Sequence, residues 1–251
     1  MSREPILEIT NYSKKYDEKP AVTDLSLTVY EGEIFGFIGH NGAGKSTTIK
    51  SVVGILQQGR DSGEITVCGM PLSNHKKECQ KLMAYIPDNP DLYEYMTGIG
   101  YINFVADIFN VPEEVRTNRV KRYADAFEIT DALGDLISSY SHGMRQKVAL
   151  IAAFVHAPKL FVLDEPFVGL DPKATAVLKA TMREFCDNGS AIFFSTHILD
   201  VAERLCDRVA MIDHGRLVVT GSVEELTKEK TLEEVFLQNL ETLEQGESTH
   251  A

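Results

Sequence analysis

The sequence lacks several features that mark secreted, membrane-spanning or metal-cluster proteins. It has no tryptophan and four cysteines, which show neither C-x-x-C pairing nor another metal-ligand spacing, so ordinary thiols in a reducing cytoplasm are expected. No apolar run approaches the length that crosses a bilayer. The first ten residues have no apolar core of the kind found in signal peptides.

Positive charge is also scarce, with 25 Lys and Arg against 37 Asp and Glu and a net charge of -12. Proteins that hold nucleic acid on a broad basic surface have the opposite balance, so no nucleic-acid partner is expected. The 43% hydrophobic and 25% charged content is ordinary for a soluble globular protein. A chain of 251 residues can bury one large core and carry a small inserted subdomain.

The chain does have a glycine-rich stretch, GHNGAGKST, at residues 39–47. The apolar run 34–38 before it predicts a buried strand, and helically spaced apolar residues after it predict a helix that begins near Gly44. In this context the pattern G-x-x-x-x-G-K-[ST] predicts a phosphate site, with Lys45 on the β- and γ-phosphates and the Ser46 hydroxyl on Mg²⁺. The residues assigned to it are Gly39, His40, Asn41, Gly42, Ala43, Gly44, Lys45, Ser46 and Thr47.

Patterns elsewhere predict an α/β fold with a mainly parallel core sheet. Residues 6–13 and 25–30 alternate apolar and polar side chains, as antiparallel strands do, with a turn between them that exposes Tyr16. A helical insertion is predicted at 97–157, and the strands and helices that alternate after it indicate a parallel sheet. Beyond Gly221 we expect short helices and then a polar tail, 238–251, with a disordered end.

Two carboxylates follow the apolar strand that ends at Leu163. Ionised carboxylates at this place are costly unless a cation is near, and a Mg²⁺ at the phosphate loop supplies one. Asp164 fits the metal-side acid, and Glu165 fits the base that activates the attacking water. His197 follows another strand of the same sheet and is therefore expected at the same ligand-binding edge.

A second anion-binding turn is predicted at Ser141 to Gly143, where a Ser-x-Gly sequence opens a helix. This turn belongs to the helical insertion, away from the chain's own phosphate loop. A helix end with no ligand of its own suggests that a second copy of the chain supplies one.

Together these motifs resemble the nucleotide-binding subunit of an ABC transporter, from Tyr16 to about Leu237. GHNGAGKST is similar to its Walker A motif, LFVLDE to Walker B, YSHGM to the signature, GLDP at 169–172 to the D-loop and STH to the switch histidine. The resemblance implies a single ABC ATPase domain over 1–237 that hydrolyses ATP with Mg²⁺. It also implies that Tyr16 stacks on the adenine.

The resemblance further implies a head-to-tail dimer, with ATP between the phosphate loop of one subunit and the signature turn of the other. Ser141 and Gly143 would contact the γ-phosphate across this dimer, and Asp171 would couple the two sites. An integral membrane subunit would be the other partner, which places the chain as a peripheral protein on the cytoplasmic face of the cell membrane. The YSHGMRQK and LEEVF sequences are most similar to exporters of drugs, antimicrobial peptides or lipid-linked polymers.

The chain departs from the family pattern at two positions. Asp88 stands where the family usually has glutamine, and its carboxylate is expected to ligate Mg²⁺. His142 replaces the usual first glycine of the signature. The loop 88–96, with Leu92, Tyr93, Tyr95 and Met96, is the expected docking surface for the membrane subunit.

Three other functions share part of this pattern. An importer ATPase uses the same catalytic motifs. A soluble ABC protein that acts on ribosomes or DNA usually has two cassettes or a long coiled-coil insertion, and this chain shows neither. A small-molecule P-loop kinase would leave the Ser-x-Gly turn and GLDP unexplained.

Overall fold

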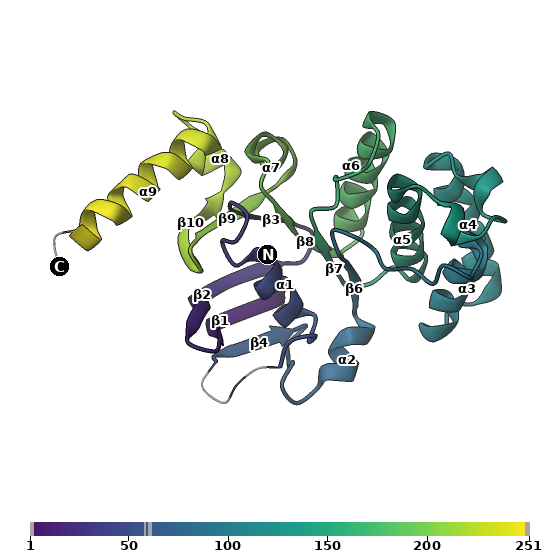
Figure 1. Cartoon of the computed structure of the whole chain (residues 1–251), viewed down its shortest axis with the longest axis horizontal. Coiled ribbons are helices and arrows are strands. Elements are labelled where there is room, and N and C mark those ends of the chain that lie inside the picture. Colours follow the sequence, from purple (N-terminus) through teal and green to yellow (C-terminus); the bar gives the residue numbers. More distant parts are fainter. Residues whose placement is uncertain (1–2, 58, 60–61, 249–251) are drawn as a thin grey trace.

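The computed structural model, which describes residues 3–57, 59 and 62–248, contains two β-sheets with helices packed around them (Figure 1). The strands are β1 (Pro5–Tyr16), β2 (Lys19–Tyr30), β3 (Ile34–Ile38), β4 (Glu64–Val67), β5 (Met70–Pro71), β6 (Met83–Ile86), β7 (Leu160–Asp164), β8 (Ala191–Thr196), β9 (Arg208–Asp213) and β10 (Arg216–Ser222). The helices are α1 (Lys45–Val52), α2 (Lys76–Lys81), α3 (Gly98–Ile108), α4 (Glu113–Ala126), α5 (His142–His156), α6 (Pro172–Asp187), α7 (Leu199–Leu205), α8 (Val223–Leu226) and α9 (Leu232–Ser248), with short 3-10 turns η1 (Thr130–Ala132) and η2 (Ile137–Ser139).

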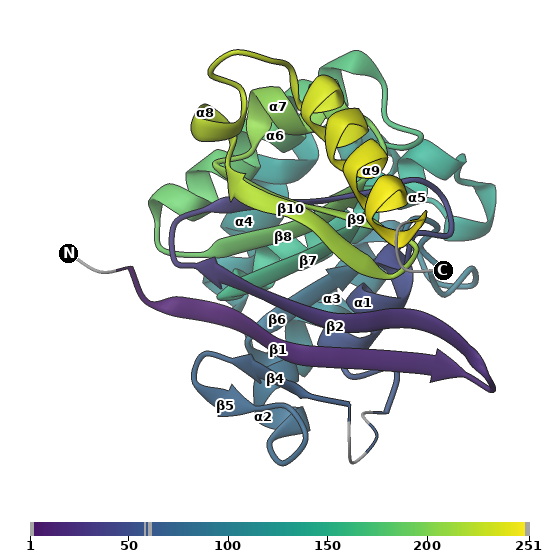
Figure 2. The same cartoon turned by 90° about the vertical axis from the view of Figure 1, so that its left-hand side faces the viewer.

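The first sheet is antiparallel, in the order β2-β1-β4-β5. Figure 2 shows β1, β2 and β4 side by side below the other sheet. The two long strands form a tight hairpin in which Tyr16 pairs with Lys19. The strands therefore run through most of the residues predicted as a turn, because the polar residues at this exposed end keep their backbone pairing.

The second sheet has the order β10-β9-β3-β8-β7-β6, and its five strands other than β10 are parallel. Every residue of β3, β7 and β8 is buried, as expected of parallel strands covered on both faces. Because parallel strands all end at one edge, the segments that follow β3, β6, β7, β8 and β9 meet there. The predicted α/β architecture is confirmed.

Helices α3, α4 and α5 lie together at the end of the molecule opposite α9 (Figure 1). They occupy the predicted helical insertion, and their shared core includes Tyr123, Phe127 and Phe154. Helix α5 also contacts the edge strand β6, so the helical group is packed against the parallel sheet. The domain boundaries at 97 and 157 stay a prediction.

The C-terminal part differs from its prediction. Strand β10 was not expected, and α9 continues to Ser248, where a polar and partly disordered tail from 238 was predicted. The start of α9 is docked on the body, since Leu232 is buried and its N–H donates to Glu203 of α7 at 2.8 Å. This docking offsets the free-energy cost of nucleating α9, whose polar sequence alone does not favour a helix. Residues 249–251 lie outside the described part. Among the described residues, no helix has the length and apolar character needed to cross a membrane.

Candidate nucleotide site

A pocket of about 240 Å³ opens at the edge of the parallel sheet where β3, β6 and β7 end. Most of its lining comes from the glycine-rich loop, and the rest comes from strand ends that are distant in sequence. The lining residues are Ala21, His40, Asn41, Gly42, Gly44, Lys45, Ser46, Thr47, Asp88, Asp164 and Glu165. The sheet therefore brings the predicted phosphate loop together with Asp88, Asp164 and Glu165, the acidic side chains assigned to the metal and to catalysis.

The glycine-rich loop has a conformation that only glycine satisfies at two points. A Cβ at Gly39 would lie 2.4 Å from the Ile212 carbonyl oxygen, and one at Gly44 would lie 2.6 Å from that of Ala21. Gly44 also has a left-handed φ of 110°. It begins α1 without a side-chain cap, so the first N–H groups of this helix are available to an anion. This uncapped end fits the phosphates of a nucleotide.

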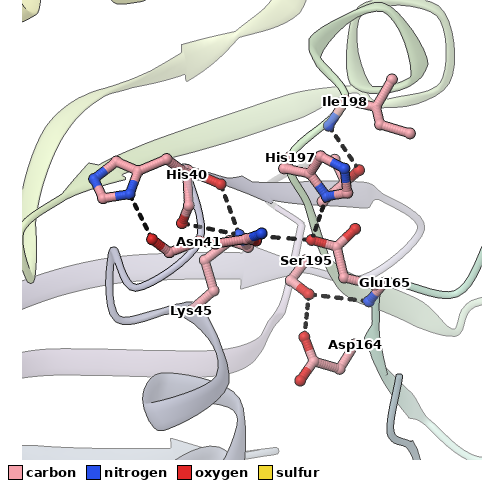
Figure 3. Close-up of polar contacts among 10 residues, drawn as sticks. His40, Asn41, Lys45, Asp164, Glu165, Ser195, His197 and Ile198 are labelled. Carbon is pink, nitrogen blue, oxygen red and sulfur yellow. Dashed lines mark hydrogen bonds and ion pairs between the residues drawn. The ribbon is translucent and has the colours of Figure 1, made fainter. Parts of the chain in front are cut away.

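Lys45 is buried at the centre of the pocket (Figure 3). Its ammonium donates to the carbonyl oxygens of Gly39 at 2.6 Å and His40 at 3.2 Å, and lies 3.5 Å from Oε1 of Glu165. These contacts hold the positive charge beside the loop. The same carboxylate oxygen of Glu165 is 3.0 Å from Nδ1 of His197, so Glu165 lies between a lysine and a histidine.

Ser195 joins the two acidic residues, a role that the sequence reasoning missed. Its hydroxyl donates to Oδ1 of Asp164 and accepts the backbone N–H of Glu165 at 3.1 Å. Glu165 has a left-handed φ of 47°, a conformation that costs a non-glycine residue about 1–3 kcal/mol and that is frequent at active sites. The signal was available, because Ser195 stands two residues before His197 at the end of the next strand.

The metal-side residues fit Mg²⁺ by their chemistry. Ser46, Asp88 and Asp164 place hydroxyl and carboxylate oxygens in one pocket, and hard oxygen donors are the ligands that Mg²⁺ takes. Burial, with Asp164 and Asp88 close by, raises the pKa of the Tyr85 hydroxyl to about 12. The phenol beside these two carboxylates is therefore neutral at physiological pH.

Comparison with known proteins identifies the family of the chain. The family model described as "ABC transporter" matches residues 22–168. The chain belongs to the ABC transporter family. It is 35% identical over 92% of its length to the uncharacterized ABC transporter ATP-binding protein YdbJ of Bacillus subtilis, covering 75% of that protein. It is 30% identical over 88% of its length to the linearmycin resistance ATP-binding protein LnrL of the same organism, covering 70% of it. A solved ATP-binding subunit of an ABC transporter superposes with a TM-score of 0.89 at 33% identity, covering 94% of this chain and 99% of that one.

Membership of the ABC family makes this chain an ATP-binding protein and an ATPase. Five assigned residues outside the phosphate loop do not line the pocket: Tyr16, Ser141, Gly143, Asp171 and His197. Of these, His197 contacts the lining residue Glu165. Tyr16 is exposed at the end of the β1–β2 hairpin. Gly39 and Ala43 belong to the same loop but support it from behind, since Ala43 is fully buried.

The ABC signature turn is a separate structure at the start of α5. The Ser141 hydroxyl accepts the Met144 N–H at 3.3 Å and caps the helix. A Cβ at Gly143 would lie 2.6 Å from the Gly169 carbonyl oxygen, so the turn is packed on the D-loop. Asp171 caps α6 through the Ala174 N–H at 2.8 Å and pairs with Lys147 of α5 at 3.0 Å.

His142, which replaces the usual first glycine of the ABC signature, fits beside the D-loop because its neighbour has no side chain. A Cβ on Gly169 would lie 2.2 Å from Cδ2 of the His142 ring. The imidazole thus occupies the space that any larger residue at 169 would fill. The histidine at 142 therefore fits beside the D-loop of its own chain.

Proposed function

We propose that this ABC ATPase is the motor subunit of an exporter that carries drugs, antimicrobial peptides or lipid-linked polymers. It would act as a peripheral protein on the cytoplasmic face of the membrane, bound to an integral membrane subunit and paired with a second copy of itself. The likeness to a resistance protein, LnrL, supports export. The observation that carries the proposal is an apolar groove whose rim is continuous with the nucleotide pocket.

Within the pocket, the chain's own residues have distinct proposed roles. Lys45 and the N–H groups of the loop and α1 bind the phosphates, and Ser46, Asp88 and Asp164 would hold Mg²⁺, which neutralises phosphate charge when bound. Glu165 orients and deprotonates the attacking water, because it is the carboxylate beside Lys45 that is not assigned to the metal. His197, at 3.0 Å from Glu165, holds that carboxylate in place.

The remaining ATP contacts are proposed to come from other parts of the dimer. Tyr16 would stack on the adenine of the ATP bound to its own chain. Ser141 and Gly143 would meet the γ-phosphate held by the second copy. The Ser141 hydroxyl uses a lone pair to accept from Met144, so its O–H stays available to donate to a phosphate oxygen.

The groove lies between the end of β6 and helices α3 and α5. Its volume is about 240 Å³, and it is lined by apolar residues that include Leu92, Val105 and Phe109. Segment 87–92 belongs to both sites, since Asp88 lines the nucleotide pocket while Pro87 and Leu92 line the groove. A change at Asp88 can therefore alter the groove directly.

Exposed aromatic rings lie beside this groove, next to its lining residue Tyr101. Tyr95 is 83% exposed and stacks on Tyr93, which is 47% exposed and also contacts the rings of Tyr101 and Phe104. Leu92, predicted as part of the displayed surface, is instead buried, and Met96 packs against the core. The two tyrosines are thus the better docking residues, suited to an amphipathic element of the membrane subunit.

The test is assembly in membranes. Tyr93→Ala with Tyr95→Ala should leave the purified chain folded and able to bind ATP, but should remove it from the membrane fraction and from complexes isolated with a spanning subunit. Ile55→Ala, which alters an exposed apolar residue elsewhere, is the matched control and should assemble normally. Assembly of the double variant at the wild-type level would contradict the proposed groove.

A further inference from the structure

Three side chains outside the proposed magnesium ligands meet at the rim of the nucleotide pocket. His40 belongs to the phosphate loop, Asp213 ends β9 and His214 lies in the turn to β10. Each offers one ligand atom, and these atoms all lie within 4.8 Å of one another. Nε2 of His40 is 2.5 Å from Oδ1 of Asp213, and Nε2 of His214 is 3.8 Å from Oδ2 of the same carboxylate.

The His40 ring is oriented as in a metal site. Its Nδ1 lies 2.7 Å from its neighbour's carbonyl oxygen, Asn41 O, which can only accept a hydrogen bond. When Nδ1 donates to this carbonyl, the neutral ring has a lone pair at Nε2, and that lone pair faces the Asp213 carboxylate. At this separation a proton bridges the two atoms, and a metal ion with bonds of about 2.0–2.2 Å to each would replace the proton and move the atoms slightly apart. A backbone carbonyl on the other ring nitrogen is the usual support of a metal-binding histidine.

The backbone that carries these ligands is held rigidly. The Gly215 N–H donates to the Ala43 carbonyl at 2.9 Å, which fastens the β9–β10 turn to the phosphate loop. His214 has a left-handed φ of 44°, next to Gly215 at 79°. This turn favours Asn or Gly over histidine at its first position, so the imidazole is present at a cost in backbone strain.

We propose that His40, Asp213 and His214 form a binding site for a transition-metal dication of the Zn²⁺ class. Two imidazoles and one carboxylate suit Zn²⁺, Ni²⁺ or Cu²⁺, whereas Mg²⁺ takes oxygen ligands. The His214 side chain is 84% exposed, and its ring meets the His40 ring edge-on with centroids 5.3 Å apart, so a small rotation would bring its Nε2 onto an ion held by His40 and Asp213. The exposed side of the site leaves coordination positions for water, as in an exchangeable rather than a structural site. A proton alone could bridge His40 and Asp213, but it would not account for the nearby Nε2 of His214.

The experiment is a Zn²⁺ titration of the full-length chain without nucleotide or Mg²⁺, in competition with a chromophoric chelator. The wild type should bind one Zn²⁺ that excess Mg²⁺ does not displace, and its Tm should rise with Zn²⁺. His214→Asn keeps a residue that tolerates the left-handed turn and removes a ligand, so its affinity should fall about 10-fold or more. His75→Asn, at an exposed histidine on another surface, is the control and should bind as the wild type does.

Asp213→Asn provides a second variant that keeps the shape of the side chain and should also lose Zn²⁺ affinity. If circular dichroism shows that His214→Asn is unfolded, the Zn²⁺ affinity of Asp213→Asn tests the proposed site instead. Absence of Zn²⁺ binding by the wild type would mean that a proton bridges His40 and Asp213, and would overturn the proposal. Equal affinity in the wild type and the folded ligand variants, or a loss in His75→Asn, would place the bound ion elsewhere and overturn it as well.

Discussion

Two helices of this chain begin at turns that suit a phosphate, and they differ in how their free N–H groups are satisfied. Helix α1 starts at Gly44 with no side-chain cap, inside a pocket that holds Lys45 and three carboxylates. Helix α5 starts at Ser141, whose hydroxyl caps it from within. The free N–H groups of an uncapped helix end are available to water or to a ligand, whereas a side-chain cap already satisfies one of them. The first helix end therefore lies in a pocket whose lining comes from one chain, and the second is suited to a ligand that another chain brings.

The largest expected effect concerns catalysis in the nucleotide pocket. Glu165→Gln should keep ATP affinity and slow hydrolysis by about 10²–10⁴-fold, because the amide keeps the shape and loses the basicity. The variant should also accumulate as a nucleotide-bound dimer in gel filtration with ATP. Glu113→Gln, an exposed change on α4, should leave turnover unaltered. Near-normal turnover of Glu165→Gln would show that another residue is the catalytic base, with His197 as the next candidate.

Removal of the fixed charge in the same site should abolish tight binding. Lys45→Ala is expected to weaken ATP binding by about 100-fold or more, since it deletes the ammonium that faces the terminal phosphates and leaves Glu165 without its partner. Calorimetry with ATP measures this. Lys50→Ala, at an exposed position of the same helix, should bind normally. Unchanged affinity in Lys45→Ala would refute the phosphate-loop assignment.

The capped helix should respond differently. Ser141→Ala should leave ATP affinity unchanged but lower ATP-driven dimer formation and hydrolysis about tenfold or more, because it deletes a donor to a charged phosphate. Thr97→Ala removes the equivalent cap of α3, in which Thr97 accepts from the Gly100 N–H at 3.1 Å. Both variants should lose about 1 kcal/mol of stability. If both also lose hydrolysis equally, Ser141 is only a cap.

The smallest effect concerns acid stability beside the capped helix. The Ala174 N–H, and after it Lys147, lower the pKa of Asp171 below its ordinary value. Its contribution to stability is therefore present above about pH 4 and is lost as the pH falls further, through the folded-state pKa. Asp171→Asn keeps a capping side chain without the charge. The gap between its urea midpoint and that of the wild type should be largest at pH 7 and should close towards pH 3, and a gap that is constant with pH would contradict this.

The sequence predicted which residues line the nucleotide pocket better than it predicted the hydrogen bonds and ion pairs among them. Buried strands and the glycine pattern are local signals, and the cation requirement of a strand-end carboxylate was enough to place Asp164 and Glu165 at the phosphate loop, whereas Asp88 was assigned through the family resemblance. Ser195 and Asp213 also lie near the ends of parallel strands, but their roles depend on side-chain directions that spacing does not give. The course of α9 could not be predicted, because it depends on the burial of Leu232 against the body rather than on its own composition.

The edge of the parallel sheet has a consequence for folding. The pocket and its rim draw on residues from 21 to 214, so an N-terminal fragment that ends before His214 lacks part of the site. We therefore expect ATP to bind only after β3, β6 and β7 have come together, and to act as a stabilising ligand for the sheet. At a concentration 100 times its Kd, a ligand of this kind adds about 2.7 kcal/mol to the free energy of unfolding. In a cell rich in ATP, the nucleotide is then part of what keeps this chain folded.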